Sequence, residues 1–204
     1  MNVKVAGIVL AAGRSRRLGG EDNKCLLPVD GVPMVVRVAR LSLETCATTV
    51  VTTGFDADAV QDALSPLADS VRIAFNPNWE SGQASSLKTG LTPLAETFDG
   101  CAIFLADQPC VQPETVRRLL AEFRVRPHEF IAPRHQGRRG NPVIIPAHRF
   151  YEIMALGGDA GARPLLKRYG VHEVDVSDPG VLLDVDTMSD YAALRDHESD
   201  ANQP

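Results

Sequence analysis

The sequence lacks several features that would place it in common protein classes. It has four cysteines in 204 residues and no C-x-x-C pair, so neither a disulfide framework nor a zinc ribbon is indicated. Reduced, buried thiols are expected instead. A basic surplus is also missing, because the formal net charge is -5. This balance argues against a general nucleic-acid binder, which needs positive charge to neutralise phosphates.

Long hydrophobic runs are absent as well. The apolar run near the N-terminus ends at Gly13 and Arg14, well short of the roughly 20 residues that span a membrane. We therefore expect a cytoplasmic protein with neither a membrane nor a nucleic acid as partner. With 44% hydrophobic and 23% charged residues and no internal repeat, the chain suits one soluble domain.

Strand and helix patterns alternate along the chain, which is typical of an α/β fold. Apolar runs predict buried strands at 3–11, 48–54, 71–76 and 100–107. Helices are predicted at 33–46, at 56–67 with Asp56 as N-cap, at 84–94 and at 113–123. We expect a single-domain parallel sheet with helices on both faces over residues 1–196, and a disordered tail at 197–204.

Glycines and cations are concentrated in the segment directly after the first predicted strand. VLAAGRSRRLGGEDNK, residues 9–24, contains Gly13, Gly19, Gly20, Arg14, Arg16, Arg17 and Lys24. Ligands of parallel sheets bind beyond the carboxyl ends of the strands. Glycines let the backbone approach a phosphate, and cations pair with its oxygens. The segment matches neither G-x-G-x-x-G nor G-x-x-x-x-G-K-[ST], and a glycine-rich turn with solvated arginines would have the same composition.

Aspartates follow two other apolar runs. In FLADQP, Asp107 comes after a buried strand, where it either faces the phosphate loop or caps the next helix. In LLDVDT, Asp184 and Asp186 are expected on the same face of a short strand. Magnesium takes such oxygen ligands together with substrate phosphates. Asp107 and one of the other two are therefore candidate metal ligands, whereas the histidines show no metal-ligand spacing.

Three further segments carry residues suited to ligand binding. In WESGQASSLKTG, Ser85 or Ser86 either meets a nucleotide or caps a helix. In HQGRRG, Arg138 and Arg139 either meet an anionic acceptor or form a solvated hairpin tip. Glycine-rich loops at 140–142 and 157–163 come late in the chain, where such loops seldom serve the nucleotide.

The loop after the first strand resembles the signature of the MobA-like nucleotidyltransferases. Leu10-Ala11-Ala12-Gly13-x-Ser15-x-Arg17-Leu18-Gly19, followed by Lys24, is similar to L-A-[AG]-G-x-S-x-R-M-G, with Leu18 where methionine is usual. Further stretches resemble the molybdenum cofactor cytidylyltransferase branch in the family order. They are residues 24–27, 31–33, 82–87, 106–109, 140–142, 158–163 and 184–187.

This resemblance implies a three-layer α/β/α Rossmann-like fold with a mostly parallel sheet. It implies transfer of CMP from CTP to the terminal phosphate of molybdopterin, with Mg²⁺ or Mn²⁺ held by Asp107 and Asp186. Catalytic roles fall to Arg17, Lys24 and Asp107, and a client molybdoenzyme is an expected transient partner. The cytidylyltransferases have Leu-Ala-Ala-Gly where the guanylyltransferases have Leu-Ala-Gly-Gly, so Ala12 is expected to exclude the larger purine.

These arguments assign two sets of binding residues. The nucleotide is assigned to Leu10, Ala11, Ala12, Gly13, Arg14, Ser15, Arg17, Lys24, Gly54, Gly82, Ser85, Ser86 and Asp107. The acceptor is assigned to Gln108, Arg138, Gly140, Asn141, Pro142, Asp159, Gly161 and Arg163.

Two alternatives stay open. One is a nucleotidyltransferase for a sugar phosphate or another alcohol, or one that uses a guanine nucleotide. The late glycine-rich loops count against a sugar-phosphate acceptor. The other is a non-catalytic molybdenum cofactor carrier, which would not need a magnesium triphosphate site.

Overall fold

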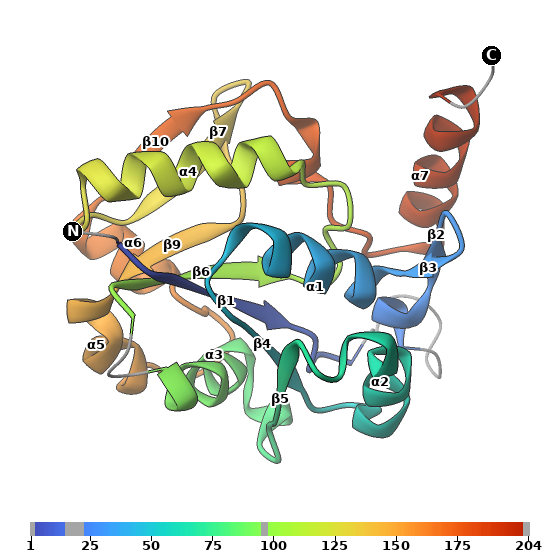
Figure 1. Cartoon of the computed structure of the whole chain (residues 1–204), viewed down its shortest axis with the longest axis horizontal. Coiled ribbons are helices and arrows are strands. Elements are labelled where there is room, and N and C mark those ends of the chain that lie inside the picture. The colour runs from blue at the N-terminus through green and yellow to red at the C-terminus, as the bar shows by residue number, and fades with distance from the viewer. Residues whose placement is uncertain (1–2, 15–22, 95–97, 202–204) are drawn as a thin grey trace.

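A mostly parallel sheet forms the centre of the molecule in the computed structural model, which describes residues 3–14, 23–94 and 98–201 (Figure 1). The strand order is β10-β7-β9-β6-β1-β4-β5, with β8 paired to β7. The strands are β1 (Val5–Leu10), β4 (Thr49–Thr53), β5 (Val71–Phe75), β6 (Gly100–Leu105), β7 (Ile131–His135), β8 (Arg138–Arg139), β9 (Val143–Pro146) and β10 (His172–Asp175). A separate antiparallel pair is β2 (Pro28–Val29) and β3 (Val32–Pro33).

Seven α-helices are described around the sheet. They are α1 (Met34–Thr45), α2 (Ala57–Ala63), α3 (Gln83–Leu91), α4 (Pro113–Val125), α5 (Phe150–Met154), α6 (Arg163–Tyr169) and α7 (Met188–Ala201). Short 3-10 turns are η1 (Lys24–Leu26), η2 (Ser65–Leu67), η3 (Trp79–Ser81), η4 (Thr92–Leu94), η5 (Ala147–Arg149) and η6 (Pro179–Leu182). None of the described helices is long and apolar enough to cross a membrane.

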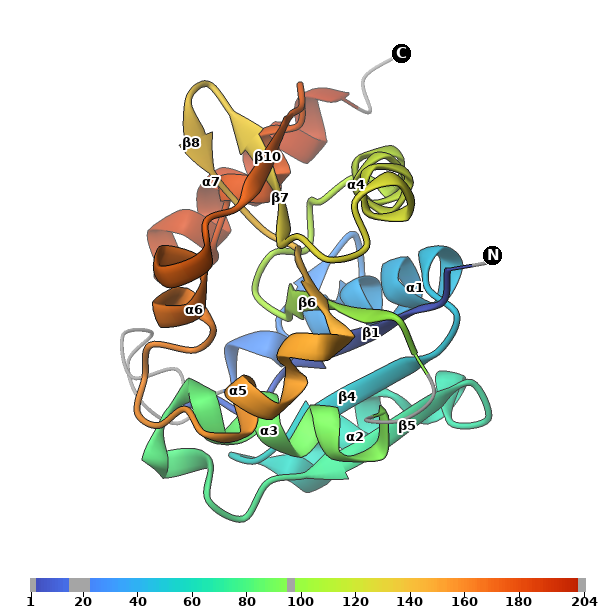
Figure 2. The ribbon, with the colours of Figure 1, turned by 90° about the vertical axis from the view of Figure 1, so that its left-hand side faces the viewer.

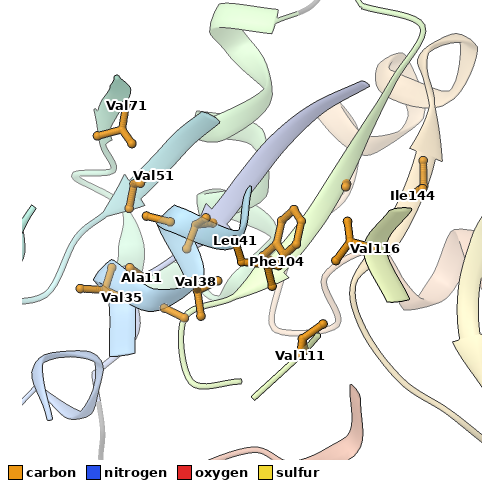
Figure 3. Packing of buried hydrophobic residues seen from close by; sticks show 14 of the residues in the cluster. Ala11, Val35, Val38, Leu41, Val51, Val71, Phe104, Val111, Val116 and Ile144 are labelled. Atoms are coloured by element: carbon orange, nitrogen blue, oxygen red, sulfur yellow. The ribbon is translucent and has the colours of Figure 1, made fainter. Parts of the chain in front are cut away.

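Adjacent residues of the central strands pack into different layers. Val9, Val51 and Phe104 lie in a cluster with α1 and α4, which is seen from close by in Figure 3. Their neighbours Ile8, Val50 and Ile103 lie in a second cluster with α3, α5 and α6. Because side chains alternate across a strand, the two clusters cover opposite faces of the sheet. Figure 2 shows α1 and α4 on one side of the sheet and α3, α5 and α6 on the other.

The predicted α/β class is confirmed, with limited corrections. The helix predicted at 84–94 is α3 followed by η4, and Asp56 precedes α2 with a left-handed φ of 54° and no capping hydrogen bond from its side chain. Asp184 and Asp186 lie outside any strand. The sheet is mostly parallel, as the resemblance implied; within it, β9 pairs antiparallel with β6 and β7, and β8 pairs antiparallel with β7. Helix α7 continues to Ala201, into the segment predicted as a tail.

All four cysteines are free, as predicted. Cys25 and Cys101 are buried, whereas Cys46 and Cys110 are only partly so.

Candidate active site

A cavity of about 560 Å³ opens beyond the carboxyl ends of β1 and β6. These strands pair in parallel with Leu10 opposite Leu105, so the segments that follow them start side by side. The main chain of Asp107 then accepts a hydrogen bond from the Val185 amide at 2.9 Å. Segments that are far apart in the sequence therefore meet at one edge of the sheet, where α/β proteins bind ligands.

Lys24 lies between two carboxylates at the base of this cavity. Its Nζ is 2.6 Å from Asp107 Oδ2 and 2.7 Å from Asp186 Oδ1. Burial alone would lower the pKa of Lys24, but Asp107 and Asp186 raise the pKa above its ordinary value. The side chain is therefore an ammonium ion, only 15% exposed, and it is held by charge-assisted hydrogen bonds.

The local chain fixes Lys24 at this position. The preceding residue, Asn23, is buried, and its Oδ1 accepts a hydrogen bond from the Cys25 amide at 3.1 Å. Its Nδ2 donates to the Phe55 carbonyl at 3.3 Å, which ties η1 to the chain after β4. Asn23 thereby sets the start of η1, and Lys24 is directed toward the aspartates.

Asp184 and Asp186 have different surroundings. Asp184 Oδ1 accepts a hydrogen bond from Gln108 Nε2 at 2.5 Å, and partial burial together with the charge of Asp107 raises its pKa. Asp186 instead faces Lys24, and its amide donates to Asp190 Oδ2 at 3.2 Å in the first turn of α7. The geometry thus brings Asp186, and not Asp184, together with Asp107 around one cation.

The donor set fits a hard divalent cation. Two carboxylate oxygens, from Asp107 and Asp186, converge on the single point that Lys24 Nζ takes here. Among the described residues, no group of three or more His, Cys, Asp or Glu side chains is arranged to hold a metal. Two carboxylates suffice for magnesium, which usually completes its shell with substrate phosphates and water. These residues could therefore hold a metal only in partnership with a ligand.

One wall of the cavity is built from small and aromatic residues. Ala12 is 2% exposed, and its carbonyl accepts a hydrogen bond from the Phe55 amide at 3.1 Å. A Cβ added at Gly54 would lie 2.5 Å from Trp79 Cβ and 2.9 Å from Ala12 Cβ, so only glycine fits behind this wall. Phe55 packs edge-on against Trp79 with ring centroids 5.6 Å apart, and the Arg14 guanidinium lies 5.3 Å from the Phe55 ring centre.

The loop between α5 and α6 closes against the start of α3. The Ala84 amide donates to the Gly158 carbonyl at 3.1 Å. Gly82 has a φ of +106°, and a Cβ there would lie 2.5 Å from Asp159 Oδ1 and 2.6 Å from the Gly158 backbone. Gly161 meets Gln83 in a similarly close contact. This close packing places Asp159 in the cavity lining.

We expect Gly82→Ala to destabilise the fold more than Gly137→Ala. Both glycines have positive φ, which costs an L-residue roughly 1–2 kcal/mol, but nothing lies within 4 Å of a Cβ added at Gly137. The overlap with the Gly158 backbone and the Asp159 side chain should add about 1–3 kcal/mol at Gly82 alone. Urea unfolding measures the free energy of unfolding of the two variants. Equal decreases in this free energy would show that the loop at 158–159 moves aside to make room for the added Cβ.

The cavity gathers many of the predicted binding residues. From the predicted nucleotide set it is lined by Leu10, Ala12, Gly13, Arg14, Lys24, Gly82, Ser86 and Asp107, and Asp186 joins them. Ala11 lies in the core, and Gly54 lies behind the wall that it shares with Ala12. Ser85 Oγ accepts from Asn76 and donates to main-chain carbonyls, as expected for a structural role at the start of a helix. The predictions for Ser15 and Arg17 concern residues outside the described part of the chain.

Only one of the predicted acceptor residues, Asp159, lines this cavity. Arg138 is exposed on the β7–β8 hairpin, and Arg163 is exposed at the start of α6. Gly140 and Asn141 contact the main chain of Val181 in η6, and the buried Gln108 contacts Asp184. Pro142 is buried beside them, and Gly161 packs on Gln83. Gln108, Gly140, Asn141 and Gly161 therefore contact segments around the cavity without lining it, and Arg138 and Arg163 are exposed outside its lining.

Several cavity residues were not predicted as site residues: Cys25, Trp79, Glu80, Gln83 and Leu105. Trp79, Glu80 and Gln83 belong to the stretch WESGQASS, in which the sequence analysis singled out only the glycine and the serines. Cys25 is not suited to nucleophilic catalysis, because burial, with a contribution from Asp107, raises the pKa of its thiol to about 12.

Comparison with known proteins identifies the family. The model of the MobA-like NTP transferase domain matches residues 7–174. The purine catabolism protein PucB of Bacillus subtilis is 31% identical, with 93% of this chain and 95% of that protein aligned. A probable molybdenum cofactor guanylyltransferase of Pelotomaculum thermopropionicum is 28% identical over 70% of this chain and 62% of that protein.

Solved structures agree with this assignment. Rv0371c of Mycobacterium tuberculosis superposes with a TM-score of 0.81 at 31% identity, covering 96% of this chain and all of that one. A structure of the same protein in complex with manganese gives a TM-score of 0.78. A cavity at the strand ends that combines a lysine with two aspartates, in a chain matched over residues 7–174, shows that this protein belongs to the MobA-like NTP transferase family.

Proposed function

We propose that this nucleotidyltransferase transfers CMP from CTP to the terminal phosphate of molybdopterin, giving the cytosine dinucleotide and pyrophosphate. The observation that carries the proposal is the convergence of Asp107 and Asp186 on Lys24 in the cavity beyond β1 and β6, which Gly13 and Arg14 also line. Carboxylates can hold a metal ion, and an ammonium group can pair with phosphate oxygens, so this arrangement supports binding of a metal-bound triphosphate. The acceptor is inferred from the family motifs and from the relative named as a probable molybdenum cofactor guanylyltransferase. The choice of cytosine is inferred only from Leu10-Ala11-Ala12-Gly13, where the guanylyltransferases have Leu-Ala-Gly-Gly.

In the proposed reaction, a phosphate oxygen of the acceptor bonds to the α-phosphorus of CTP. The bond from that phosphorus to the oxygen bridging toward the β-phosphorus breaks, and pyrophosphate leaves with the electron pair. Such a transfer needs positioning and charge neutralisation more than covalent help from the protein. The high pKa of Cys25 is consistent with a direct transfer.

The carboxylates and the ammonium group of the site would bind different partners. Asp107 and Asp186 would hold Mg²⁺ or Mn²⁺, which supplies charge neutralisation at the phosphates. Lys24 would then turn its ammonium from the carboxylates to the phosphate oxygens, a change that its flexible stem allows. The backbone amides of Ala12 and Gly13 would donate hydrogen bonds to the remaining phosphate oxygens. The manganese complex of Rv0371c supports a divalent cation in this family.

A pyrophosphate-release assay with CTP, GTP, ATP and UTP tests the proposal. Each nucleotide is supplied with and without molybdopterin, and also with a sugar phosphate in its place. We expect release that depends on both CTP and the pterin. Turnover with a sugar phosphate alone would contradict the acceptor assignment, and binding of the pterin with no nucleotide turnover would favour a carrier. Contact with a client molybdoenzyme stays a prediction.

Ala12→Gly should shift base preference toward GTP. The Ala12 Cβ lies in the wall formed with Gly54 and Trp79, so removing this methyl group widens the cavity there. A methyl-sized change is worth about 1–3 kcal/mol of discrimination, so we expect roughly a tenfold change in the ratio of kcat/KM for CTP and GTP. Both nucleotides are measured on the same variant with the same acceptor.

Ala68→Gly offers a matched control, because it removes the same methyl group at an exposed position outside the cavity. An unchanged ratio in Ala12→Gly would show that Ala12 only shapes the backbone. If the unmodified protein already prefers GTP, the cytidylyltransferase assignment fails, and the family assignment is unaffected.

A further inference from the structure

A buried asparagine follows β5 at its carboxyl end, toward the edge of the sheet where the cavity lies. Asn76 comes directly after Phe75, the last residue of the strand, and is only 1% exposed. Its main-chain amide donates to the Thr53 carbonyl at 2.8 Å, which continues the pairing of β5 with β4 by one residue. A side-chain amide buried to this degree is costly unless it is hydrogen-bonded, so its partners indicate its role.

The hydrogen bonds of Asn76 fix the orientation of its side-chain amide. Asn76 Oδ1 accepts from the Asn78 amide at 3.0 Å. Its Nδ2 therefore faces the first turn of α3, where it donates to Ser85 Oγ at 2.8 Å and to Ser86 Oγ at 3.0 Å. Since an amide nitrogen donates and does not accept, both serine oxygens accept here, and their own hydrogens must point elsewhere.

The two serines differ in where their hydrogens go. Ser85 Oγ donates to main-chain carbonyls, those of Asn78 at 2.9 Å and Gly82 at 2.8 Å. Ser86 Oγ donates no hydrogen bond to any residue in the described part of the chain, although Ser86 is buried, with 6% exposed, and lines the cavity. A buried hydroxyl hydrogen without an acceptor is unfavourable, so an acceptor atom of a ligand in the cavity would complete its hydrogen bonding.

We infer that Asn76 is a positioning residue, whose amide holds the Ser86 hydroxyl as a hydrogen-bond donor to an acceptor atom of the bound nucleotide. The inference rests on the proposed function, because it takes the cavity as the site of the nucleotide. An aspartate of the same size would reverse the arrangement, because a carboxylate accepts where the amide donates. The Ser86 hydrogen would then turn from the cavity to the aspartate, and the nucleotide would lose a donor.

Nucleotide affinity in a double-mutant cycle tests this role. Trp79 is the one tryptophan of the chain and lines the cavity, so its fluorescence follows titration with CTP, GTP, ATP and UTP in the presence of Mg²⁺. For the nucleotide that binds most tightly, we expect Asn76→Asp and Ser86→Ala each to weaken binding by about 5- to 50-fold. In the Ser86→Ala background, Asn76→Asp should cost at least about threefold less affinity than it does alone, because the hydroxyl that it turns is gone.

Ser85→Ala provides the matched control. It removes the neighbouring hydroxyl that Asn76 also contacts, but whose hydrogen goes to the main chain. Asn76→Asp should therefore keep its full effect on affinity in the Ser85→Ala background. Urea unfolding of each variant checks that it is folded under the conditions of the titration. If Asn76→Asp is unfolded, Asn76→Ala replaces it in the cycle, since the hydroxyl is no longer held once the amide is removed.

The outcomes separate this inference from the proposed function. An equal effect of the Asn76 substitution with and without the Ser86 hydroxyl would show that Asn76 only supports the fold, and the inference is then overturned while the CTP assignment stands. Unchanged affinity in Ser86→Ala would overturn the inference as well. If the unmodified chain binds GTP more tightly than CTP, the proposed base fails, and the cycle measured with GTP decides the role of Asn76. If no nucleotide binds, both fail.

Discussion

Replacing Asp107 by asparagine is expected to reduce magnesium-dependent transfer by about a thousandfold or more, which corresponds to roughly 4 kcal/mol of transition-state stabilisation. Asp107 Oδ2 is one of the two carboxylate oxygens that converge on the position of Lys24 Nζ. Asparagine keeps the size of the side chain but removes its charge, so the cation loses one of its two anionic ligands. The rate is measured as a function of magnesium concentration, because a lost ligand raises the concentration that is needed.

Two neighbouring aspartates provide the comparison. Asp186→Asn should also weaken transfer severely, since Asp186 Oδ1 faces the same point. Asp184→Asn should stay within a few-fold of the unmodified rate, because its amide oxygen can still accept the hydrogen bond from Gln108. Equal losses for Asp184→Asn and Asp186→Asn would remove the distinction that the geometry draws between them.

The first part of the fold was predictable because its patterns are strong and local. Runs rich in apolar and β-branched residues predicted β1, β4, β5 and β6 to within a few residues, since such residues suit strands buried in a parallel sheet. In α4, the residues at helical spacing, Val116, Leu119, Leu120 and Phe123, are all buried as predicted. Errors at the ends reflect local chemistry, as at Asp56, where a left-handed backbone replaces the expected side-chain cap.

The later strands gave no comparable signal. β7 contains Pro133, and β9 and β10 have four residues each, so none of them shows a clear period. The antiparallel insertion of β9 between β6 and β7 depends on long-range pairing, which the local pattern does not encode. The alternation of strands and helices predicted parallel pairing, and it did not show where the antiparallel strand β9 would insert.

Part of the cavity lining was predictable from the sequence, but its arrangement was not. Motif positions indicated Lys24, Asp107 and Asp186, yet the sequence assigned the lysine to phosphate and the aspartates to metal. Their ion pair joins residues as far as 162 positions apart, so it follows only from the tertiary structure. Trp79 and Glu80 had no periodicity or charge pattern to mark them, although they lie beside the predicted glycine-serine turn. Their role appears only when η3 is placed against Gly54 and the cavity.

Lys24→Ala is expected to lower kcat and at the same time to tighten binding of a divalent cation. The ammonium contributes about 2–4 kcal/mol to stabilising the triphosphate transition state, so kcat should fall by roughly 30- to 1,000-fold. The same ammonium also lies between Asp107 and Asp186, where it competes with the metal for their oxygens. Removing it leaves two neighbouring carboxylates without their cation, and like charges held close together favour any cation that joins them.

The two effects are measured separately, with Mn²⁺ affinity by electron paramagnetic resonance and kcat under saturating metal. Lys24→Arg should retain more activity than Lys24→Ala because it keeps the charge, and Lys167→Ala, on the exposed face of α6, serves as the control for losing a cation elsewhere. Unchanged turnover in Lys24→Ala would contradict the phosphate role. Weaker Mn²⁺ binding would show that Lys24 organises the aspartates and does not compete for them. Opposite changes in affinity and rate are the specific signature of a lysine that occupies the carboxylate pair until a metal-bound nucleotide replaces it.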